Sequence, residues 1–322
     1  VYLGSYPREM GKVRMSTVFL FPGQGSQKVG MGKDLVETSA SAKRRYEEAN
    51  DIMGMDLAKL SFEGPEETLR QTEVTQPALF VVSVVLAELV MAGGLTPSFS
   101  AGHSLGEYSA LTTANVFTFT EALTLVKLRG DAMSQAGQER SGTMAAVIGL
   151  DADAVECICD KASEGAEVAV PANFNSPGQI VISGNVDAVK NAMKLAEKSG
   201  ATKAIELNVS GAFHSPLMEA AKMSMKKALD KISLNRAQFP IVMNVSAEAV
   251  SEPEKIKENL IRQLDNPVRW IETVETLQDL GATDFVEVGP GRVLQGLNRR
   301  IDRTLSTRGI ERFDQIKELA LA

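Results

Sequence analysis

Histidine and cysteine are both scarce in this sequence. Only His103 and His214 occur among 322 residues, so a reaction that needs an imidazole base has two candidates. The two cysteines, Cys157 and Cys159, lie two positions apart, a spacing that fits neither a zinc site nor a C-x-x-C redox pair. We therefore expect free thiols in a reducing compartment.

Long apolar runs and an excess of positive charge are also missing. No run approaches the roughly 20 apolar residues that cross a bilayer. The longest, residues 78–92, is interrupted by Ser83 and Glu88 and predicts a buried helix. The net charge of -7 disfavours non-specific binding to nucleic acid, although a local basic patch remains compatible with an acidic partner. We expect neither a membrane nor a nucleic acid among the partners.

The first 16 residues carry Arg8, Lys12 and Arg14 with no apolar block behind them, which argues against a secretory signal. We expect a cytoplasmic protein, or one in an organelle stroma or matrix if these residues are the stub of a processed leader.

Short apolar runs alternate with helical patterns towards both ends of the chain. Strands are predicted at residues 17–21, 98–101, 240–244 and 284–288. Helices are predicted at residues 41–53, 77–91 and 118–136, the last begun by the capping box Thr118-x-x-Glu121. This alternation predicts an α/β fold with a mainly parallel sheet covered on both faces.

The middle of the chain has a different order of elements. We predict strands at 142–149, 167–173, 179–184 and 202–209, and helices at 153–163 and 186–199. The order βαββαβ is typical of a ferredoxin-like fold. We therefore predict a large α/β subdomain formed by residues 17–140 and 210–305, with a small α+β subdomain, residues 141–209, inserted into it.

Ser104 lies in the segment Gly102-His103-Ser104-Leu105-Gly106, between a predicted strand and a helical pattern that begins at Glu107. A G-x-S-x-G nucleophile requires this strand–turn–helix setting. The glycines permit a tight turn, and the helix N-terminus offers backbone N–H groups to a developing oxyanion, the first from Leu105. We predict that Ser104 is a nucleophile; the alternative is a glycine-rich turn that happens to hold a serine.

A serine hydroxyl needs a base to become a nucleophile at neutral pH. His103 is adjacent to Ser104, and neighbouring residues on a turn point apart, so His103 is poorly placed for that role. His214 follows a predicted strand and precedes a predicted helix, and α/β folds place their sites in such loops. We predict that His214 is the general base; the alternative is a structural histidine.

Five segments then occur in a recognisable order: Phe21-Pro-Gly-Gln-Gly-Ser-Gln27, Gly102-His-Ser-Leu-Gly106, Lys127-Leu-Arg-Gly130, Gly211-Ala-Phe-His214 and Glu287-Val-Gly-Pro-Gly291. Together they resemble the malonyl-CoA:acyl carrier protein transacylases of type II fatty acid synthesis, to which polyketide synthase acyltransferase domains are related. The resemblance covers residues 17–301. It implies a hydrolase-like core with an inserted ferredoxin-like subdomain, in agreement with the order of elements above.

The resemblance also implies roles for matching residues. Gln24 matches the residue whose backbone N–H is the second oxyanion donor, and Arg129 matches the arginine that binds the malonyl carboxylate. Gln263 matches the glutamine that helps to orient the catalytic histidine in place of a triad aspartate. An arginine suits a carboxylate because its guanidinium is planar and bidentate. The alternatives are a turn residue, a surface arginine and an ordinary helical glutamine.

Further residues are assigned to substrate binding by the same resemblance. Phe213 leaves little space for an α-methyl group, which implies selection of malonyl over methylmalonyl. Asn173 and Asn175 lie in a predicted loop that resembles the family's Asn-x-Asn segment and would line the substrate channel; a plain Asx turn is the alternative. We place His103 with them.

The resemblance implies transfer of a malonyl group from malonyl-CoA to the phosphopantetheine thiol of acyl carrier protein, through an acyl-serine intermediate, for fatty acid synthesis. It implies no metal and no other cofactor. We expect a monomer that docks the acidic carrier protein on Arg292, Arg299 and Arg300. The alternatives are a stand-alone acyltransferase of a polyketide synthase, a serine thioesterase or carboxylesterase, and a non-catalytic module that binds the carrier.

Overall fold

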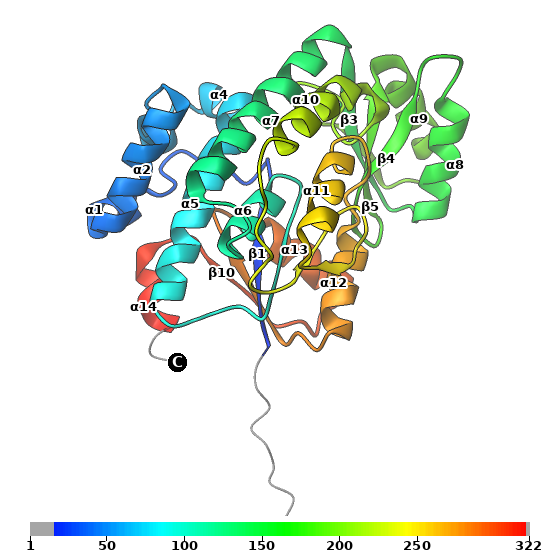
Figure 1. The fold of residues 1–322 in the computed structure, drawn as a ribbon. Helices are drawn as coiled ribbons and strands as arrows, with labels where there is room; N and C mark the ends of the chain where they lie inside the picture. The colour runs from blue at the N-terminus through cyan, green and yellow to red at the C-terminus, as the bar shows by residue number, and fades with distance from the viewer. Residues whose placement is uncertain (1–15, 320–322) are drawn as a thin grey trace, which may run out of the picture.

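The computed structural model describes residues 16–319, which form two β-sheets surrounded by helices (Figure 1). The expectation of a processed leader concerns residues 1–16 and therefore lies, apart from Ser16, outside the described residues.

The larger sheet has six strands in the order β10-β9-β1-β2-β7-β8. All neighbouring pairs are parallel except β7 with β8, so the prediction of a mainly parallel sheet is confirmed. The strands are β1 (Thr17–Phe21), β2 (Phe99–Gly102), β7 (Ile241–Val242), β8 (Ala249–Val250), β9 (Asp284–Val288) and β10 (Thr307–Ile310). The strand predicted at 240–244 is shorter than expected, and β8 and β10 were not predicted.

The central strand β1 is buried along its whole length. Phe19 and Phe21 pack into the core on one face of the sheet, while Val18 and Leu20 pack into the core on the other. Both faces of a parallel sheet are covered by its crossover helices, so β1 is apolar throughout instead of alternating. Its carboxyl end, beside that of β2, is where the candidate site is built.

The helices of this part of the chain surround the sheet. They are α1 (Lys33–Thr38), α2 (Ala40–Met53), α3 (Leu57–Glu63), α4 (Glu66–Leu69), α5 (Thr72–Ala92), α6 (Gly106–Thr113), α7 (Phe119–Glu139), the 3-10 turn η1 (Pro216–Met218), α10 (Glu219–Leu229), α11 (Pro253–Arg262), α12 (Trp270–Asp279), α13 (Val293–Ile301) and α14 (Phe313–Leu319). Residues of α5, α6 and α7 join the core that contains Phe19, and residues of α12 and α13 join the core that contains Val18.

Helix α5 is longer than predicted. It begins at Thr72, five residues before the predicted start, and holds Pro77 in its interior. The apolar pattern missed this start because the first turns carry the polar but buried Thr72, Thr75 and Gln76. By length and composition α5 could cross a membrane, contrary to the sequence analysis, but 83% of its most apolar stretch is buried inside the protein. In this structure it is a core helix.

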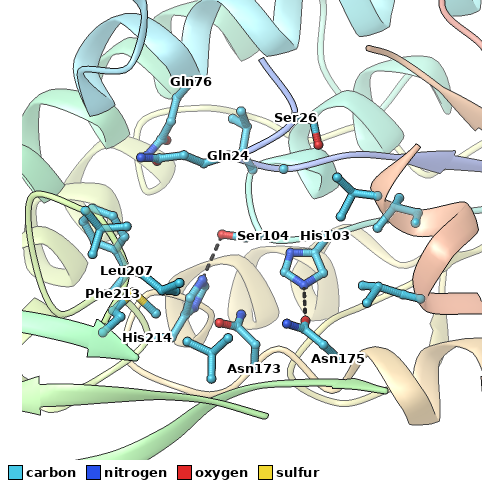
Figure 2. Close-up of a pocket in the computed structure, with 18 of the residues that line it drawn as sticks. Gln24, Ser26, Gln76, His103, Ser104, Asn173, Asn175, Leu207, Phe213 and His214 are labelled. Carbon is cyan, nitrogen blue, oxygen red and sulfur yellow. Dashed lines mark hydrogen bonds between the residues drawn. The ribbon is translucent and has the colours of Figure 1, made fainter. Parts of the chain in front are cut away.

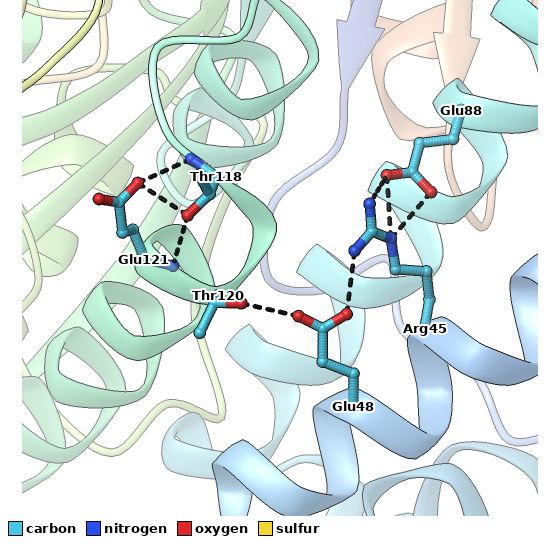
Figure 3. A network of polar contacts seen from close by, with 6 residues as sticks. All are labelled: Arg45, Glu48, Glu88, Thr118, Thr120 and Glu121. Carbon is cyan, nitrogen blue, oxygen red and sulfur yellow. Dashed lines mark hydrogen bonds and ion pairs between the residues drawn. The ribbon is translucent and has the colours of Figure 1, made fainter.

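Arg45 joins three helices on the outer side of this core (Figure 3). Its guanidinium donates to both carboxylate oxygens of Glu88 on α5, at 2.7–3.1 Å, and to Glu48 on its own helix. Glu48 accepts in turn from Thr120 of α7, and the guanidinium lies 4.7 Å from the ring centre of Phe119. These half-exposed contacts fix α2 against α5 and α7.

The predicted capping box at the start of α7 is confirmed (Figure 3). The Thr118 hydroxyl accepts the backbone N–H of Glu121, and the Glu121 carboxylate accepts the backbone N–H of Thr118. The helix that carries Arg129 therefore begins at a defined residue.

The smaller sheet is antiparallel, with the order β4-β5-β3-β6. Its elements are β3 (Gly142–Ile148), α8 (Ala152–Ala162), β4 (Ala169–Ser176), β5 (Gln179–Asn185), α9 (Val186–Lys198) and β6 (Lys203–Glu206). The predicted order βαββαβ is confirmed, and these elements share a hydrophobic core of their own. The division into two subdomains and the likeness of the larger sheet to a hydrolase core stay predictions.

The two sheets meet beside the candidate site. Phe174 of β4 donates its backbone N–H to Val268, and Val268 donates to Ala172, so a short parallel bridge joins the small sheet to the segment before α12. Helix α13 also contacts β4. The small sheet is thereby held over the ends of β1 and β2.

The close packing of α6 on β1 gives a test of the fold. A Cβ on Gly106 would lie 2.1 Å from the carbonyl oxygen of Phe21, a backbone atom that cannot move aside. We expect Gly106→Ala to lower the free energy of unfolding by about 3 kcal/mol, measured by denaturant titration. Gly296→Ala is the matched control, because nothing lies within 4 Å of a Cβ in that interior position of α13. It should be neutral or stabilising by up to about 1 kcal/mol; equal losses in both variants would contradict the packing argument.

Candidate active site

Ser104 lies at the tight turn between β2 and α6, with its backbone in the left-handed region at φ 52°. A non-glycine residue in that region costs of order 1–3 kcal/mol and needs support from its surroundings. Asn244, just after β7, supplies it: its Oδ1 accepts the N–H of Ser104 at 2.7 Å, and its Nδ2 donates to the Gly102 carbonyl at 2.6 Å. Gly102 has no room for a side chain, since a Cβ would lie 1.9 Å from Gly106. The turn is therefore fixed on both sides of the nucleophile.

His214 lies opposite, in the loop after β6, and also has a left-handed backbone at φ 58°. Its Nε2 is 2.9 Å from Ser104 Oγ (Figure 2). Its Nδ1 is 2.7 Å from the backbone carbonyl oxygen of Gln263. A carbonyl only accepts, so Nδ1 carries the proton and Nε2 presents its lone pair to the serine hydroxyl. This is the tautomer that a general base requires.

The imidazole of His214 is held neutral by its surroundings. Burial, together with the nearby positive charge of Arg129, lowers the pKa of His214 to about 3, although the hydrogen bond to the Gln263 carbonyl acts in the opposite direction. The imidazole is thus free to accept a proton at neutral pH, and it would be a weak base.

Arg129 reaches the same serine from α7, and only 1% of its surface is exposed. One terminal nitrogen donates to Gln76 Oε1 at 2.7 Å; the other donates to Ser104 Oγ at 3.0 Å and to Gln263 Oε1 at 2.9 Å. Its Nε–H is buried without a partner among the described residues. Burial lowers the pKa of Arg129, but a guanidinium stays a cation in proteins. The surface-arginine alternative is wrong.

The two backbone N–H groups predicted for an oxyanion hole are unoccupied by other bonds. Leu105 and Gln24 donate their N–H groups to no residue in the described part of the chain. Leu105 is buried at the start of α6, and Gln24 lies in the loop after β1, where its side chain donates to Thr72 Oγ1 at 3.3 Å. Both residues line the cavity in front of Ser104.

That cavity has a volume of about 200 Å³ and lies between the two sheets (Figure 2). Nine of the ten predicted site residues line it; Gln263 lies behind it, at 0% exposure. The nine are Gln24, His103, Ser104, Leu105, Arg129, Asn173, Asn175, Phe213 and His214. Residues far apart in the sequence thus converge on one cavity.

One detail of the substrate-binding prediction is corrected. Asn173 and Asn175 both lie on β4, which continues to Ser176, three residues beyond the strand predicted at 167–173, so the loop and its Asx-turn alternative are wrong. The pairing of β4 with β5 shifts register at two places in this stretch. His103 Nε2 is 2.8 Å from Asn175 Oδ1 and points away from Ser104, as expected for a residue that is not the base (Figure 2). Burial lowers the pKa of His103.

Gln263 contacts more groups than predicted. Its backbone carbonyl orients His214, whereas its side-chain amide joins Arg129, Ser104 and Glu107. The amide nitrogen donates to the Ser104 carbonyl at 2.9 Å and to the Glu107 carboxylate. One residue therefore touches the nucleophile, its base and the cation.

Three functional candidates were not predicted from the sequence: Gln76, Glu107 and Asn244. Glu107 is fully buried, and burial raises its pKa to about 8, although hydrogen bonds from Asn244 and Gln263 and the charge of Arg129 act in the opposite direction. The signals were present, because Glu107 falls among apolar residues in a helical pattern and Asn244 ends a strand-like run. Neither signal indicates the residues with which the side chain forms hydrogen bonds.

No metal site is found among residues 16–319: no group of three histidine, cysteine, aspartate or glutamate side chains there could hold an ion. Cys157 and Cys159 are both free thiols, as predicted.

The state of His214 predicts the pH dependence of the site. For a histidine with an ordinary pKa near 6.5, the neutral fraction would be about 30-fold lower at pH 5 than at neutral pH. The pKa of His214 is far lower, so we expect the rate of Ser104 acylation by an uncharged acyl thioester to change less than about threefold between pH 7 and pH 5. Single-turnover acylation, quenched and read by mass spectrometry, measures this directly. A midpoint near pH 6.5 would contradict the assigned environment of the base.

Comparison with known proteins agrees with this geometry. Residues 18–313 match the family model described as an acyl transferase domain. A malonyl CoA-acyl carrier protein transacylase of Bacillus subtilis is 45% identical over 94% of this chain and 95% of that protein. An acyl carrier protein S-malonyltransferase structure from Vibrio cholerae superposes with a TM-score of 0.91 at 44% identity, over 94% and 99% of the two chains.

A further solved structure, a malonyl-transacylase in complex with a type II polyketide synthase acyl carrier protein, gives a TM-score of 0.92 at 41% identity, over 95% and 99% of the two chains. Each match spans nearly the whole chain and so includes every element that contributes to the cavity. The chain belongs to the acyl transferase domain family, among the malonyl-CoA:acyl carrier protein transacylases, and is an acyltransferase.

Proposed function

We propose that this enzyme transfers a malonyl group from malonyl-CoA to the phosphopantetheine thiol of acyl carrier protein, through a malonyl ester on Ser104, in fatty acid synthesis. The observation that carries the proposal is the placement of Ser104 Oγ within hydrogen-bond distance of both a neutral histidine nitrogen and a buried guanidinium. A neutral base suits proton transfer from the serine, and a buried cation suits an acyl group that ends in a carboxylate.

The malonyl carboxylate binds Arg129 in this proposal. A guanidinium has five N–H donors, and three are used by Gln76, Gln263 and Ser104. The Nε–H has no partner among the described residues, so a bound carboxylate would satisfy a buried donor and pair a buried charge. Gln76 and Gln263 hold the guanidinium in place, which keeps the substrate carbonyl near Ser104.

In the first step, His214 Nε2 takes the proton of Ser104, whose Oγ forms a bond to the thioester carbonyl carbon. The oxyanion is stabilised by the N–H groups of Gln24 and Leu105. Collapse of the tetrahedral intermediate breaks the carbon–sulfur bond, and the CoA thiolate leaves with the proton from His214. The product is a malonyl ester on Ser104, and His214 is neutral again.

In the second step, the phosphopantetheine thiol gives its proton to His214, and its sulfur attacks the ester carbonyl. The same two N–H groups stabilise the oxyanion, and the Ser104 oxygen leaves with the proton from His214. No cofactor takes part in either step. We propose that the enzyme acts as a monomer in the cytoplasm, without a membrane or nucleic acid partner.

The carrier protein is proposed to dock on α13. Arg292, which immediately precedes this helix, and Arg299 and Arg300 within it are exposed. Leu294 and Leu297 of the same helix line the cavity. Basic groups at the cavity entrance would attract an acidic carrier and raise its association rate. The polyketide carrier complex of a 41% identical malonyl-transacylase is consistent with carrier docking.

Phe213 is proposed to select malonyl over methylmalonyl. It is 6% exposed and lines the cavity beside His214. An α-methyl group on the acyl chain would have to displace this ring from a packed position.

The intact mass of the protein after mixing with malonyl-CoA tests the intermediate. We expect an adduct of malonyl mass on the native enzyme and none on Ser104→Ala, because the ester requires the serine oxygen. Addition of a carrier protein with a phosphopantetheine thiol should remove the adduct and produce malonyl-carrier. Release of free malonate at the same rate without a carrier would instead identify a thioesterase.

Substitution of Arg129 tests carboxylate recognition. Arg129→Ala removes a bidentate cation from a buried site, so we expect kcat/KM for malonyl-CoA to fall by at least about 100-fold. Acetyl-CoA has no carboxylate to lose, so its kcat/KM should change less. Arg129→Lys keeps the charge without the planar geometry and should recover only part of the loss. Equal losses of kcat/KM for malonyl-CoA and acetyl-CoA would show that Arg129 does not bind the malonyl carboxylate.

A further inference from the structure

Glu107 is a fully buried acid that the proposed reaction does not use. It lies in the first turn of α6, three residues after Ser104. One carboxylate oxygen accepts the backbone N–H of Asn244, and the other accepts from the side-chain amide of Gln263. Asn244 holds the N–H of Ser104, and Gln263 holds its carbonyl. Glu107 thus connects both residues that fix the nucleophile turn.

The carboxylate also determines which way the Gln263 amide faces. On one side of that amide lies the guanidinium of Arg129, which can only donate, and on the other lies Glu107. An ionised carboxylate can only accept, so a single orientation satisfies both neighbours: the amide oxygen towards Arg129 and the nitrogen towards Glu107. If position 107 carried an amide, its single oxygen could accept from only one of its two neighbours, the Asn244 N–H or the Gln263 amide. The orientation of Gln263 would then depend on the bond from its nitrogen to the Ser104 carbonyl.

We propose that Glu107 is a positioning residue for malonyl transfer: its ionised carboxylate fixes the Gln263 amide, which in turn fixes the guanidinium of Arg129 and makes the site selective for acyl groups that carry a carboxylate. The inference rests on the proposed function of Arg129.

Loss of this fixed orientation should affect charged and uncharged acyl groups differently. A reversed Gln263 amide would present its nitrogen to the nitrogen of Arg129, a contact between two donors that displaces the guanidinium. Malonyl transfer depends on the guanidinium and would suffer most. Acetyl transfer does not use the guanidinium to hold its acyl group; it would lose the Gln263 bond to the Ser104 carbonyl but keep the contact of His214 with the Gln263 backbone carbonyl.

Glu287 provides a matched control for a merely structural role. It is also fully buried, and it accepts the backbone N–H groups of Leu294 and Gln295 and the side-chain amide of Gln295. It contacts neither the nucleophile nor Arg129. Glu287→Gln therefore removes a comparable buried carboxylate with a comparable set of hydrogen bonds.

The experiment compares Glu107→Gln with Glu287→Gln in the acylation half-reaction at pH 9, where Glu107 is ionised, with malonyl-CoA and acetyl-CoA as substrates. An amide at position 107 has nearly the shape of the carboxyl group, but its nitrogen is a donor that must face either the Asn244 N–H or the Gln263 amide. One unsatisfied buried donor corresponds to a loss of about 10- to 100-fold, which we expect in kcat/KM for malonyl-CoA. The loss for acetyl-CoA should be at least about threefold smaller, and both substrates in Glu287→Gln should stay within about threefold of the wild type.

A pH series adds a readout that packing alone would not change. The titratable groups around the site are Arg129 and Tyr108 near Glu107, and the two histidines. Burial raises the pKa of Tyr108 to about 12 and lowers that of both histidines, so only Glu107 changes charge between about pH 7 and 9. Malonyl acylation of the wild type should rise across this interval, and that of Glu107→Gln should stay flat.

An exchange of the two side chains tests the assigned contact. Gln263→Glu alone places two carboxylates against each other. Glu107→Gln combined with Gln263→Glu restores an amide donor facing a carboxylate, with a carboxylate oxygen towards Arg129. The double variant should recover at least about tenfold in malonyl kcat/KM over Gln263→Glu. Full recovery is not expected, because the bond from position 263 to the Ser104 carbonyl is lost.

The outcomes separate the two proposals. If the wild type forms no malonyl adduct, the proposed function fails. If the wild type forms the adduct and Glu107→Gln forms it equally fast, only the role of Glu107 is overturned. Equal losses for malonyl and acetyl groups, equal losses in Glu287→Gln, or a double variant as poor as the product of the single losses would each overturn it too.

Discussion

The burial of one positive charge, on Arg129, governs the arrangement of this site. A cation removed from water is costly unless hydrogen bonds and opposite charge surround it. Here the guanidinium is 1% exposed, yet its direct partners are two amide oxygens and a hydroxyl, and the acid Glu107 lies one amide further away. The cation is held in place without being neutralised by direct contact. An incoming carboxylate would therefore meet a charge that is still available for pairing.

The same region holds the two strained residues of the site. Ser104 and His214 both have left-handed backbones, and such strain persists only where surrounding bonds over-determine the conformation. Asn244 bonds to the Gly102 carbonyl and the Ser104 N–H, on either side of His103, and Gln263 bonds to Ser104 through its amide and to His214 through its carbonyl. The distance between nucleophile and base thus depends on the end of α11 and on the residues after β7. Neither segment contains a reacting group.

Local sequence signals predicted the parts of the structure that depend on local geometry. The capping box at Thr118, the glycine-bounded turn at Ser104 and the order βαββαβ each follow from neighbouring residues. The contacts of Glu107 join it to residues 137 and 156 positions away, and no local pattern indicates which partners a buried acid has. The asparagines of β4 were assigned to a loop for a related reason, since their strand is held by irregular pairing with β5 and by a bridge to Val268. The residues proposed to react, and Gln263 beside them, could be found in the sequence, whereas Glu107 and Asn244 could not.

The weakness of the base favours transfer over hydrolysis in the proposed reaction. A buried histidine whose pKa is held well below its usual range takes a proton less readily from water than from a thiol, which is by far the stronger acid of the two. Ser104 is a poor acid as well, but Arg129 donates to its Oγ at 3.0 Å and stabilises the charge that develops as the proton leaves. Once the serine is acylated, that donor still faces Ser104 Oγ, so it assists the departure of this oxygen and not the loss of a proton from a water molecule. The second attack then relies on His214 alone, which selects the more acidic nucleophile, the thiol of the carrier.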